Sequence, residues 1–471
     1  MSIDSSVFET LTPSRLVIFK TRNPVKHRCY LRTSEIRVAV LDSHVPVHND
    51  GPPKIAAMIV PEQRETDWNF CTNAGHRQLL SDYPRLSRLI LIGNDLPRNP
   101  QPCNYIRPPD TDTDDRKKLE DELQPLVISL HPKACLQNGL PKTRFVTYED
   151  DLLYRKIIER FVGPFVGEFV VEDVLLESDD DSVDEKLRRR LRFKRMPDLI
   201  QSEVLLFPRI DGEIVTAVLN LENFMKMKNP KFFVDTTVLV HSYLTPMVSG
   251  LSLIASHLNE RIQQGFTPRA LCLGVGGGSL LSFLNSELGF EVTGVEVDGV
   301  VLTAATQHFG LHRSDSIRLI VEDAVEVIRK FATRGDTDEF DSQVNIDWLD
   351  AKYDVVMVDL DSSDARYGHT APPREFVDKS VFQAVRFLLD DNGVLIMNVV
   401  PLSHVFYTTL IQELKDVFHK VHVVDVESEE NYVVMATVSP PTPLNVDDVN
   451  DFYEKLRSVI PEESIKSIIQ V

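Results

Sequence analysis

Cysteine is scarce in this sequence, and long apolar runs are missing from it. The five cysteines are scattered, odd in number, and show neither a CxxC pair nor the Cys/His spacing of a zinc site. We therefore expect no disulfide framework and no metal. No apolar run approaches the ~18 residues needed to span a bilayer, and the first thirty residues lack the apolar core of a signal peptide. These absences predict a cytoplasmic protein without a membrane segment.

Positive charge is also in short supply. Lys and Arg number 51 against 71 Asp and Glu, which gives a formal net charge of −20 at pH 7. This balance argues against a nucleic-acid or anionic-membrane partner and favours small molecules or basic proteins. With 471 residues and 42% hydrophobic content, the chain is long enough for two or three globular units.

The first half of the chain divides into three segments. Residues 1–165 alternate short apolar runs with helical stretches, which is typical of an α/β accessory region. Residues 166–200 contain an acidic block followed by a basic block at 186–195, and we expect a solvated, charged linker because blocks of like charge rarely pack. A docking surface for another protein is the alternative. Residues 201–255 contain a β-hairpin around Asp211-Gly212 and a helical lead-in.

From residue 269 onward, apolar runs and helical stretches alternate regularly. Five strands with intervening helices predict a parallel, doubly wound sheet within residues 256–440. Two final runs, at 421–426 and 432–438, leave no room for a helix between them, so they should pair antiparallel and complete a seven-stranded, Rossmann-like sheet. Residues 441–471 are expected to form a C-terminal helical tail.

A glycine-rich turn follows the first of these strands. Gly274, Gly276 and Gly278 lie between a strand and a helix, where glycine lets a ligand approach the main chain. Glu296 lies 22 residues beyond Gly274 at the end of the second strand, where a carboxylate can accept both hydroxyls of a ribose. The GxGxxG pattern of dinucleotide enzymes is not present, because position 279 is Ser. This favours a nucleoside without a pyrophosphate, such as an adenosyl-sulfonium compound.

Further carboxylates follow the later strands. Asp323 and Asp359 each end a strand, so they should meet Gly274 and Glu296 in the crevice at the carboxyl edge of the sheet. Asp361 and Asp364 come next and can face an acceptor there. Turn or helix capping is the structural alternative for these two residues.

These motifs resemble the spermidine-synthase-like branch of the Class I methyltransferases. The resemblance rests on LCLGVGGGSL, VTGVEVDGVVLTAATQHFG, IRLIVEDAVEVI and YDVVMVDLDSSDARYGHTAPPREF, and it extends upstream to IVPEQRETDWNF and LIQSEVLL. Within this branch, the chain is similar to the family that methylates a lysine and the N-terminal α-amine of elongation factor 1-alpha. The similarity is to the carboxyl-terminal domain of those proteins. No second glycine-rich motif is present, so the lysine activity of their other domain is not carried over.

The resemblance implies S-adenosylmethionine as cofactor and a protein amine, possibly of elongation factor 1-alpha, as acceptor. It implies that the main chain of Gly274, Gly276 and Gly278 approaches the cofactor and that Glu296 holds its ribose. It also implies that Asp323 and Ala324 lie beside the adenine and that Asp359 borders the methionine part. Asp361 is the candidate catalytic residue that orients the acceptor, and Asp364 is the second.

Two other readings of the same residues stay open. Polyamine aminopropyltransferases share the fold, but their glycine run has an Asp where Gly277 stands here, and their Tyr-Gln-Glu motif is incomplete after Tyr243. A cofactor-binding scaffold without catalysis is the third reading.

Overall fold

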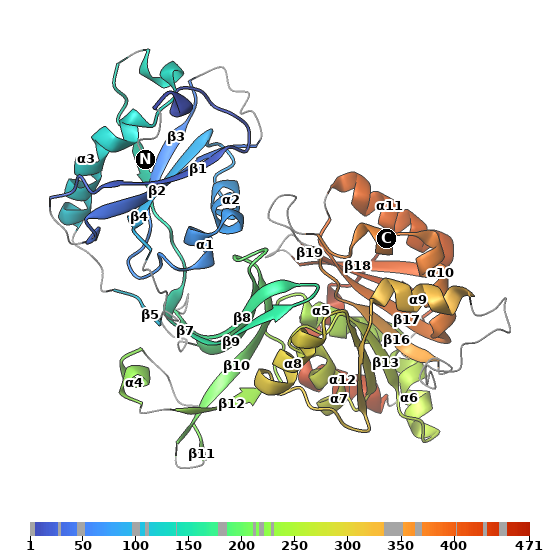
Figure 1. Cartoon of the computed structure of the whole chain (residues 1–471). Coiled ribbons are helices and arrows are strands. Elements are labelled where there is room, and N and C mark those ends of the chain that lie inside the picture. Colours follow the sequence, from blue (N-terminus) through green and yellow to red (C-terminus); the bar gives the residue numbers. More distant parts are fainter. Residues whose placement is uncertain are drawn as a thin grey trace.

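The computed structural model describes most of the chain as three units (Figure 1). We refer to them as the N-terminal unit, the middle sheet and the C-terminal unit. The described residues are 5–26, 30–44, 52–96, 104–108, 113–137, 139–177, 186–210, 213–215, 221–227, 230–333, 352–362, 370–401, 403–426, 431–441 and 450–471. Within these ranges, no helix is both long enough and apolar enough to cross a bilayer.

The N-terminal unit has helices on both faces of a five-stranded sheet. Its elements are η1 (Ser5–Phe8), β1 (Leu16–Arg22), β2 (Glu35–Asp42), β3 (Ile55–Ile59), α1 (Trp68–Cys71), α2 (Asn73–Ser81), β4 (Arg88–Asn94), α3 (Thr113–Ser129), η2 (Lys133–Leu136) and β6 (Arg144–Val146). The strand order is β1-β2-β4-β3-β6, with β3 parallel to β4 and β6. Apolar side chains of α3 pack on one face of the sheet, and those of α1 and α2 pack on the other. The expected α/β region is therefore present.

His76 on α2 is buried in its uncharged form. Its Nε2 lies 2.7 Å from the carbonyl oxygen of Phe70, and its side chain is 0% exposed. Burial lowers the pKa of His76 to about 4, although the hydrogen bond to Phe70 opposes the shift. Between pH 6.5 and pH 4, His76 is therefore protonated in the unfolded chain but not in the folded chain. Folding becomes less favourable as the pH falls through this range.

We predict that His76→Gln removes this part of the pH dependence. In the native chain, His76 should lower the free energy of unfolding by about 2 kcal/mol between pH 7 and pH 5, since one pKa unit corresponds to ~1.4 kcal/mol. Urea unfolding of both proteins at the two pH values measures the difference. An equal pH dependence in the native chain and the variant would contradict the prediction.

The middle sheet is antiparallel. It consists of β5 (Tyr105–Ile106), β7 (Leu152–Gly163), β8 (Gly167–Leu176), β9 (Lys186–Phe193), β10 (Ile200–Ile210), β11 (Glu213–Ile214) and β12 (Lys231–Asp235), and α4 (Leu221–Lys226) lies between its last two strands in the sequence. The order is β11-β10-β9-β8-β7-β5, and β12 also pairs with β10. The expected hairpin is confirmed by the pairing of β10 with β11, although Asp211 and Gly212 themselves lie outside the described residues.

The expectation of a charged linker over residues 166–200 is wrong. This segment contains β8 and β9, and the arginines of β9 pair with carboxylates on the two neighbouring strands. Arg189 binds Asp173 and Arg192 binds Glu172 on β8, while Glu203 on β10 binds both Arg188 and Arg190. The four arginines of β9 are thus paired with three carboxylates across the strands, which also argues against the docking surface. The acidic residues 178–185 lie outside the described residues.

The C-terminal unit is built on an eight-stranded sheet. Its strands are β13 (Arg269–Leu273), β14 (Glu291–Glu296), β15 (Ile317–Val321), β16 (Tyr353–Val358), β17 (Leu389–Val399), β18 (Lys420–Val426), β19 (Asn431–Thr437) and β20 (Ile469–Gln470). The order is β15-β14-β13-β16-β17-β19-β18-β20. The first five strands are parallel, and β19 is antiparallel to both β17 and β18. The predicted parallel sheet with an antiparallel pair is confirmed.

The eighth strand was not expected. β20 lies within the predicted helical tail and pairs with β18 through two residues. Two helices of that tail, α12 (Asp451–Val459) and α13 (Glu462–Lys466), precede it. A two-residue strand is too short for its own alternation of side chains to reveal it, so only the edge of β18 defines it.

Helices cover both faces of this sheet (Figure 1). One face carries α5 (Leu244–Ser249), η3 (Gly250–Ile254), α6 (Ala255–Gln263), α7 (Ser279–Ser286) and α12, and the other carries α9 (Ala324–Thr333), η4 (Arg374–Phe376), α10 (Lys379–Leu388) and α11 (His404–Val417). The chain moves from β13 outward to β15 and then returns to β16 on the other side of β13. This reversal of strand order opens a crevice at the carboxyl ends of β13 and β16.

The middle sheet packs against the C-terminal unit beside this crevice. Phe169, Leu191 and Val204 of the middle sheet form one apolar cluster with Val301 and Phe309, from α8 (Gly299–His308) and its end. The buried carboxylate of Asp298 also accepts hydrogen bonds from the N–H groups of Phe165 and Val166. The turn between β7 and β8 is thereby fixed at the start of α8.

Candidate functional site

A cavity of about 670 Å³ lies at the carboxyl ends of the parallel strands. Residues that follow β13, β14, β15 and β16 form one side of it, and residues 199–203 of the middle sheet form part of the opposite side. Gly274, Glu296, Asp323 and Asp359 all line this cavity, so the structure brings them together as the sheet topology predicts. Gly276, Ala324 and Asp361 line it as well. Asp364 lies outside the described residues.

The glycine-rich turn is crowded by protein rather than kept open on all sides. A Cβ on Gly274, where φ is +88°, would lie 2.1 Å from the carbonyl oxygen of Asp359. A Cβ on Gly276, where φ is +53°, would lie 2.6 Å from Oγ of Ser202. Gly278 faces Leu311 and is not among the residues that line the cavity, so its expected approach to a ligand stays a prediction. These glycines are needed because Asp359, Ser202 and Leu311 approach the turn closely.

Three successive N–H groups of this turn donate hydrogen bonds to side-chain oxygens. Oε2 of Glu296 accepts hydrogen bonds from the N–H groups of Val275 and Gly276, each at 3.2 Å. Oγ of Ser202 accepts a hydrogen bond from the N–H of Gly277 at 2.7 Å. A phosphate-binding loop would point such N–H groups at its ligand. The turn is therefore poorly suited to a pyrophosphate, in agreement with the missing GxGxxG pattern.

Glu296 is a buried carboxylate at the cavity wall. Its side chain also accepts a hydrogen bond from the N–H of Asp298 at 3.2 Å. Burial raises the pKa of Glu296, and the three N–H donors offset part of that shift. Each carboxylate oxygen has two lone pairs, so these three bonds fill Oε2 and leave one acceptor site on Oε1 for a further donor such as a hydroxyl group.

Asp323 has a capping role. Its Oδ1 accepts hydrogen bonds from the N–H groups of Val325 and Glu326 at the first turn of α9. Ala324 begins this helix, and both residues line the cavity together with Val325 and Val297. This corner of the cavity offers apolar walls and one exposed carboxylate, which suits a flat heterocycle.

Asp359 belongs to a polar network that sequence reasoning missed. Its Oδ2 accepts a hydrogen bond from the Tyr243 hydroxyl, and its Oδ1 accepts one from Nδ2 of Asn398, both at 3.1 Å. Oδ1 of Asn398 in turn accepts a hydrogen bond from Nδ2 of Asn431 at 3.3 Å. Burial raises the pKa of Asp359, while the bonds from Asn398 and Tyr243 lower it in part. Asn398 interrupts an apolar run, IMNVV, and this interruption was the available signal.

Asp361 faces a cation from the middle sheet. Its Oδ2 lies 3.1 Å from Nη2 of Arg195, in the turn that follows β9. Both side chains line the cavity. Sequence spacing gave no signal for this ion pair, because the two residues are 166 positions apart.

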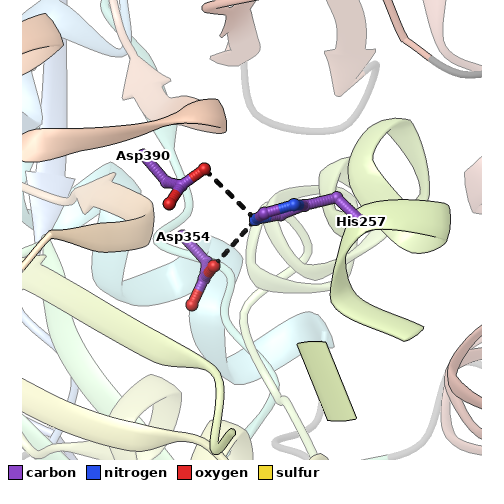
Figure 2. A group of neighbouring side chains, drawn as sticks. All are labelled: His257, Asp354 and Asp390. Carbon is purple, nitrogen blue, oxygen red and sulfur yellow. Dashed lines mark hydrogen bonds and ion pairs between the residues drawn. The ribbon is translucent and has the colours of Figure 1, made fainter. Parts of the chain in front are cut away.

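A second cluster of titratable groups lies away from the cavity (Figure 2). His257, Asp354 and Asp390 bring potential metal ligands within 4.8 Å of one another, and Figure 2 shows the histidine ring pointing at both carboxylates. Oδ1 of Asp354 also lies 3.0 Å from Nε of Arg261. A guanidinium at that position disfavours a metal cation and explains the cluster as an ion-pair network. It joins α6 to the amino ends of β16 and β17.

The strand order and the position of the cavity define the Rossmann-like sheet of Class I methyltransferases, with one added edge strand. No family model matches the chain. The chain is similar to curated proteins called eEF1A lysine and N-terminal methyltransferase. It is 29% identical to the Xenopus laevis protein over 393 residues, or 80% of this chain and 50% of that protein. It is 26% identical to the Homo sapiens protein over 397 residues, or 82% of this chain and 51% of that protein.

The resemblance inferred from the motifs is thus confirmed, and the chain spans about half the length of the curated relatives it matches. Among solved structures, human Methyltransferase-like protein 13 in complex with SAH is 27% identical and covers 48% of this chain and 93% of that chain, with a TM-score of 0.38. A probable spermidine synthase from Corynebacterium glutamicum is 14% identical and covers 64% of this chain and 87% of that chain, with a TM-score of 0.39.

Proposed function

We propose that this protein is an S-adenosylmethionine-dependent protein methyltransferase. Its acceptor is an amine of a protein such as elongation factor 1-alpha, and we favour the N-terminal α-amine over a lysine. The cavity at the sheet's carboxyl edge carries the proposal, because it combines a nucleoside-type glycine turn with carboxylates from three neighbouring strand ends. The names of the relatives indicate the same chemistry. Such a substrate would place the protein in the cytoplasm.

The residues of the cavity fit this cofactor. Glu296 would accept a ribose hydroxyl at its remaining acceptor site on Oε1, and Val297, Asp323, Ala324 and Val325 would surround the adenine. Gly274 and Gly276 would border the cofactor with bare main chain, whereas Gly278 is turned toward Leu311.

The carboxylate of Asp359 would face the methionine part of the cofactor. Many methyltransferases have an acid two residues before the first glycine, where this chain has the buried Cys272. Burial raises the pKa of that thiol, and the negative charge of Asp359 raises it further. Cys272 therefore carries no charge at neutral pH, and Asp359 is the carboxylate close to this position.

When bound, the cofactor would supply an electrophilic methyl group. The chain's own contribution is to hold an uncharged amine in line with that group, since orientation can account for much of such a rate enhancement. Asp361 would accept a hydrogen bond from the amine and then stabilise the positive charge that develops on nitrogen. An α-amine, with a pKa of about 7.7 to 8.0, offers far more neutral nucleophile at pH 7 than lysine at about 10.4.

The proposal is tested by incubating the full chain and isotopically labelled S-adenosylmethionine with intact elongation factor 1-alpha. We expect label on the N-terminal α-amine, located by mass spectrometry, and no label when that amine is acetylated. Label on a lysine would keep the enzyme class and change the acceptor. Transfer of an aminopropyl group to putrescine from the decarboxylated cofactor would replace methyl transfer with the rival activity, and no transfer at all would favour the scaffold.

We predict that Ser202→Ala weakens cofactor binding about tenfold without changing the KM for the acceptor. Loss of the hydroxyl leaves the N–H of Gly277 without its acceptor, and this costs ~1–3 kcal/mol in the present conformation of the turn. The turn should therefore rearrange in the free variant, and restoring its binding conformation lowers the affinity for the cofactor by part of that amount. Calorimetric titration with S-adenosylhomocysteine measures the effect. The control is Ser249→Ala, because Ser249 is also buried but donates to the carbonyl oxygen of Pro246 on α5, outside the cavity wall. Equal affinities in the two variants would contradict a role for Ser202 in the glycine turn.

A further inference from the structure

Arg195 connects the middle sheet to the proposed acceptor end of the cavity. Its guanidinium is 3.1 Å from Asp361, and its central carbon lies 5.0 Å from the ring centroid of Phe193. The Arg195 side chain is 32% exposed and that of Asp361 is 19% exposed. The positive charge is therefore held at the cavity wall with only partial screening by water.

Three arginines of β9 have carboxylate partners that lie within the middle sheet itself. Arg188 and Arg190 bind Glu203, and Arg189 binds Asp173, all between adjacent antiparallel strands. Arg195 instead binds a carboxylate of the C-terminal unit. That carboxylate is the one we assign to the acceptor amine, so Arg195 and the amine share a partner.

This arrangement has an electrostatic consequence for the acceptor. An amine that reaches Asp361 comes close to a fixed positive charge, and any further positive charge on the acceptor adds to the repulsion. A guanidinium has five N–H donors and can bind two carboxylates at once, as Arg64 does with Asp67 and Asp150. A carboxylate on the acceptor, a few residues from the amine, would relieve the repulsion and gain a charge-assisted hydrogen bond.

We propose that Arg195 is a specificity-determining residue of the acceptor subsite. It selects protein N-termini that carry an acidic residue within their first few positions over those that carry a basic residue there. The inference rests on the proposed function, because it requires an amine acceptor at Asp361. It also predicts that a dicationic amine such as putrescine is a poor acceptor.

The test uses the full chain and synthetic peptides with a free α-amine that differ at one residue only. Glu, Gln or Lys is placed at position 2, 3 or 4 in turn, and kcat/KM for methylation of the α-amine is measured by mass spectrometry. At the favoured position, the native chain should prefer Glu over Lys by about tenfold, the size expected from one hydrogen bond between charged groups. Arg195→Met, which keeps an unbranched side chain over Phe193, should treat the three peptides alike. Arg195→Lys should keep part of the preference.

The ratio of kcat/KM between two peptides does not depend on the folded fraction of a variant. A loss of stability therefore cannot produce the expected change in this ratio. An unchanged ratio in Arg195→Met would overturn the inference, as would a native chain that methylates all peptides equally; both outcomes leave the methyltransferase function intact. If the native chain methylates neither the peptides nor intact elongation factor 1-alpha, the proposed function fails, and the inference fails with it.

Discussion

Asp361→Ala is expected to lower the turnover number by at least about 100-fold while leaving the affinity for S-adenosylhomocysteine unchanged. Asp361 is the cavity carboxylate that we assign to the acceptor amine, and its partner Arg195 comes from the opposite wall. The cofactor would bind to the glycine turn, Glu296 and the start of α9. Removing the Asp361 carboxylate should therefore impair orientation of the acceptor and spare cofactor binding. Labelled methyl transfer measures the first effect, and calorimetric titration measures the second.

Two further variants test whether the loss of turnover comes from the charge of Asp361, from its shape, or from the removal of any carboxylate. Asp361→Asn keeps the size and one oxygen acceptor, so it should retain more turnover than Asp361→Ala if hydrogen bonding to the amine matters. Asp416→Ala removes an exposed carboxylate that pairs with Lys379 on the helical surface, and it should leave turnover unchanged. Normal turnover in Asp361→Ala would refute the assignment of Asp361.

The cavity-facing carboxylates could be predicted because topology alone brings them together. Once the alternation of strands and helices indicated a parallel sheet, Glu296, Asp323 and Asp359 had to lie at one edge. Ser202 and Arg195 could not be found in this way. They enter the cavity from an antiparallel sheet whose position depends on packing against α8, and no local pattern encodes that contact.

The linker prediction failed for a related reason. A block of basic residues predicts a solvated segment when it is considered alone, because the carboxylates that pair with it lie elsewhere in the sequence. The partners of β9 are Glu172 and Asp173 on one neighbouring strand and Glu203 on the other. Only the strand register turns these separate charges into cross-strand pairs. Conversely, strands β13 to β19 of the C-terminal sheet were predictable because each of them carries its own apolar run.

The segment IVPEQRETDWNF, which resembles the family outside the cavity, has a structural explanation. Asp67 lies in this segment with a side chain that is 1% exposed, and it binds Arg64 of the same segment, Arg155 on β7 and Arg192 on β9. Burial favours the neutral form of Asp67, but the three guanidinium groups outweigh it and hold the pKa well below its ordinary value. Asp67 therefore joins the N-terminal unit to the middle sheet through a buried, ionised carboxylate.

Asp67→Ala is accordingly expected to lower the free energy of unfolding by about 3–5 kcal/mol, the range for removing one partner of a buried ion pair. The loss is large because three buried guanidinium groups lose their shared carboxylate, although Glu172 and Asp150 still partner Arg192 and Arg64. Urea unfolding at pH 7 measures the change. Asp115→Ala is the matched control, since Asp115 pairs with Lys118 on the surface of α3 and its loss should cost at most about 0.5 kcal/mol. Similar losses in the two variants would show that the Asp67 cluster does not stabilise the junction, and the likeness of this segment to the family would then need another cause.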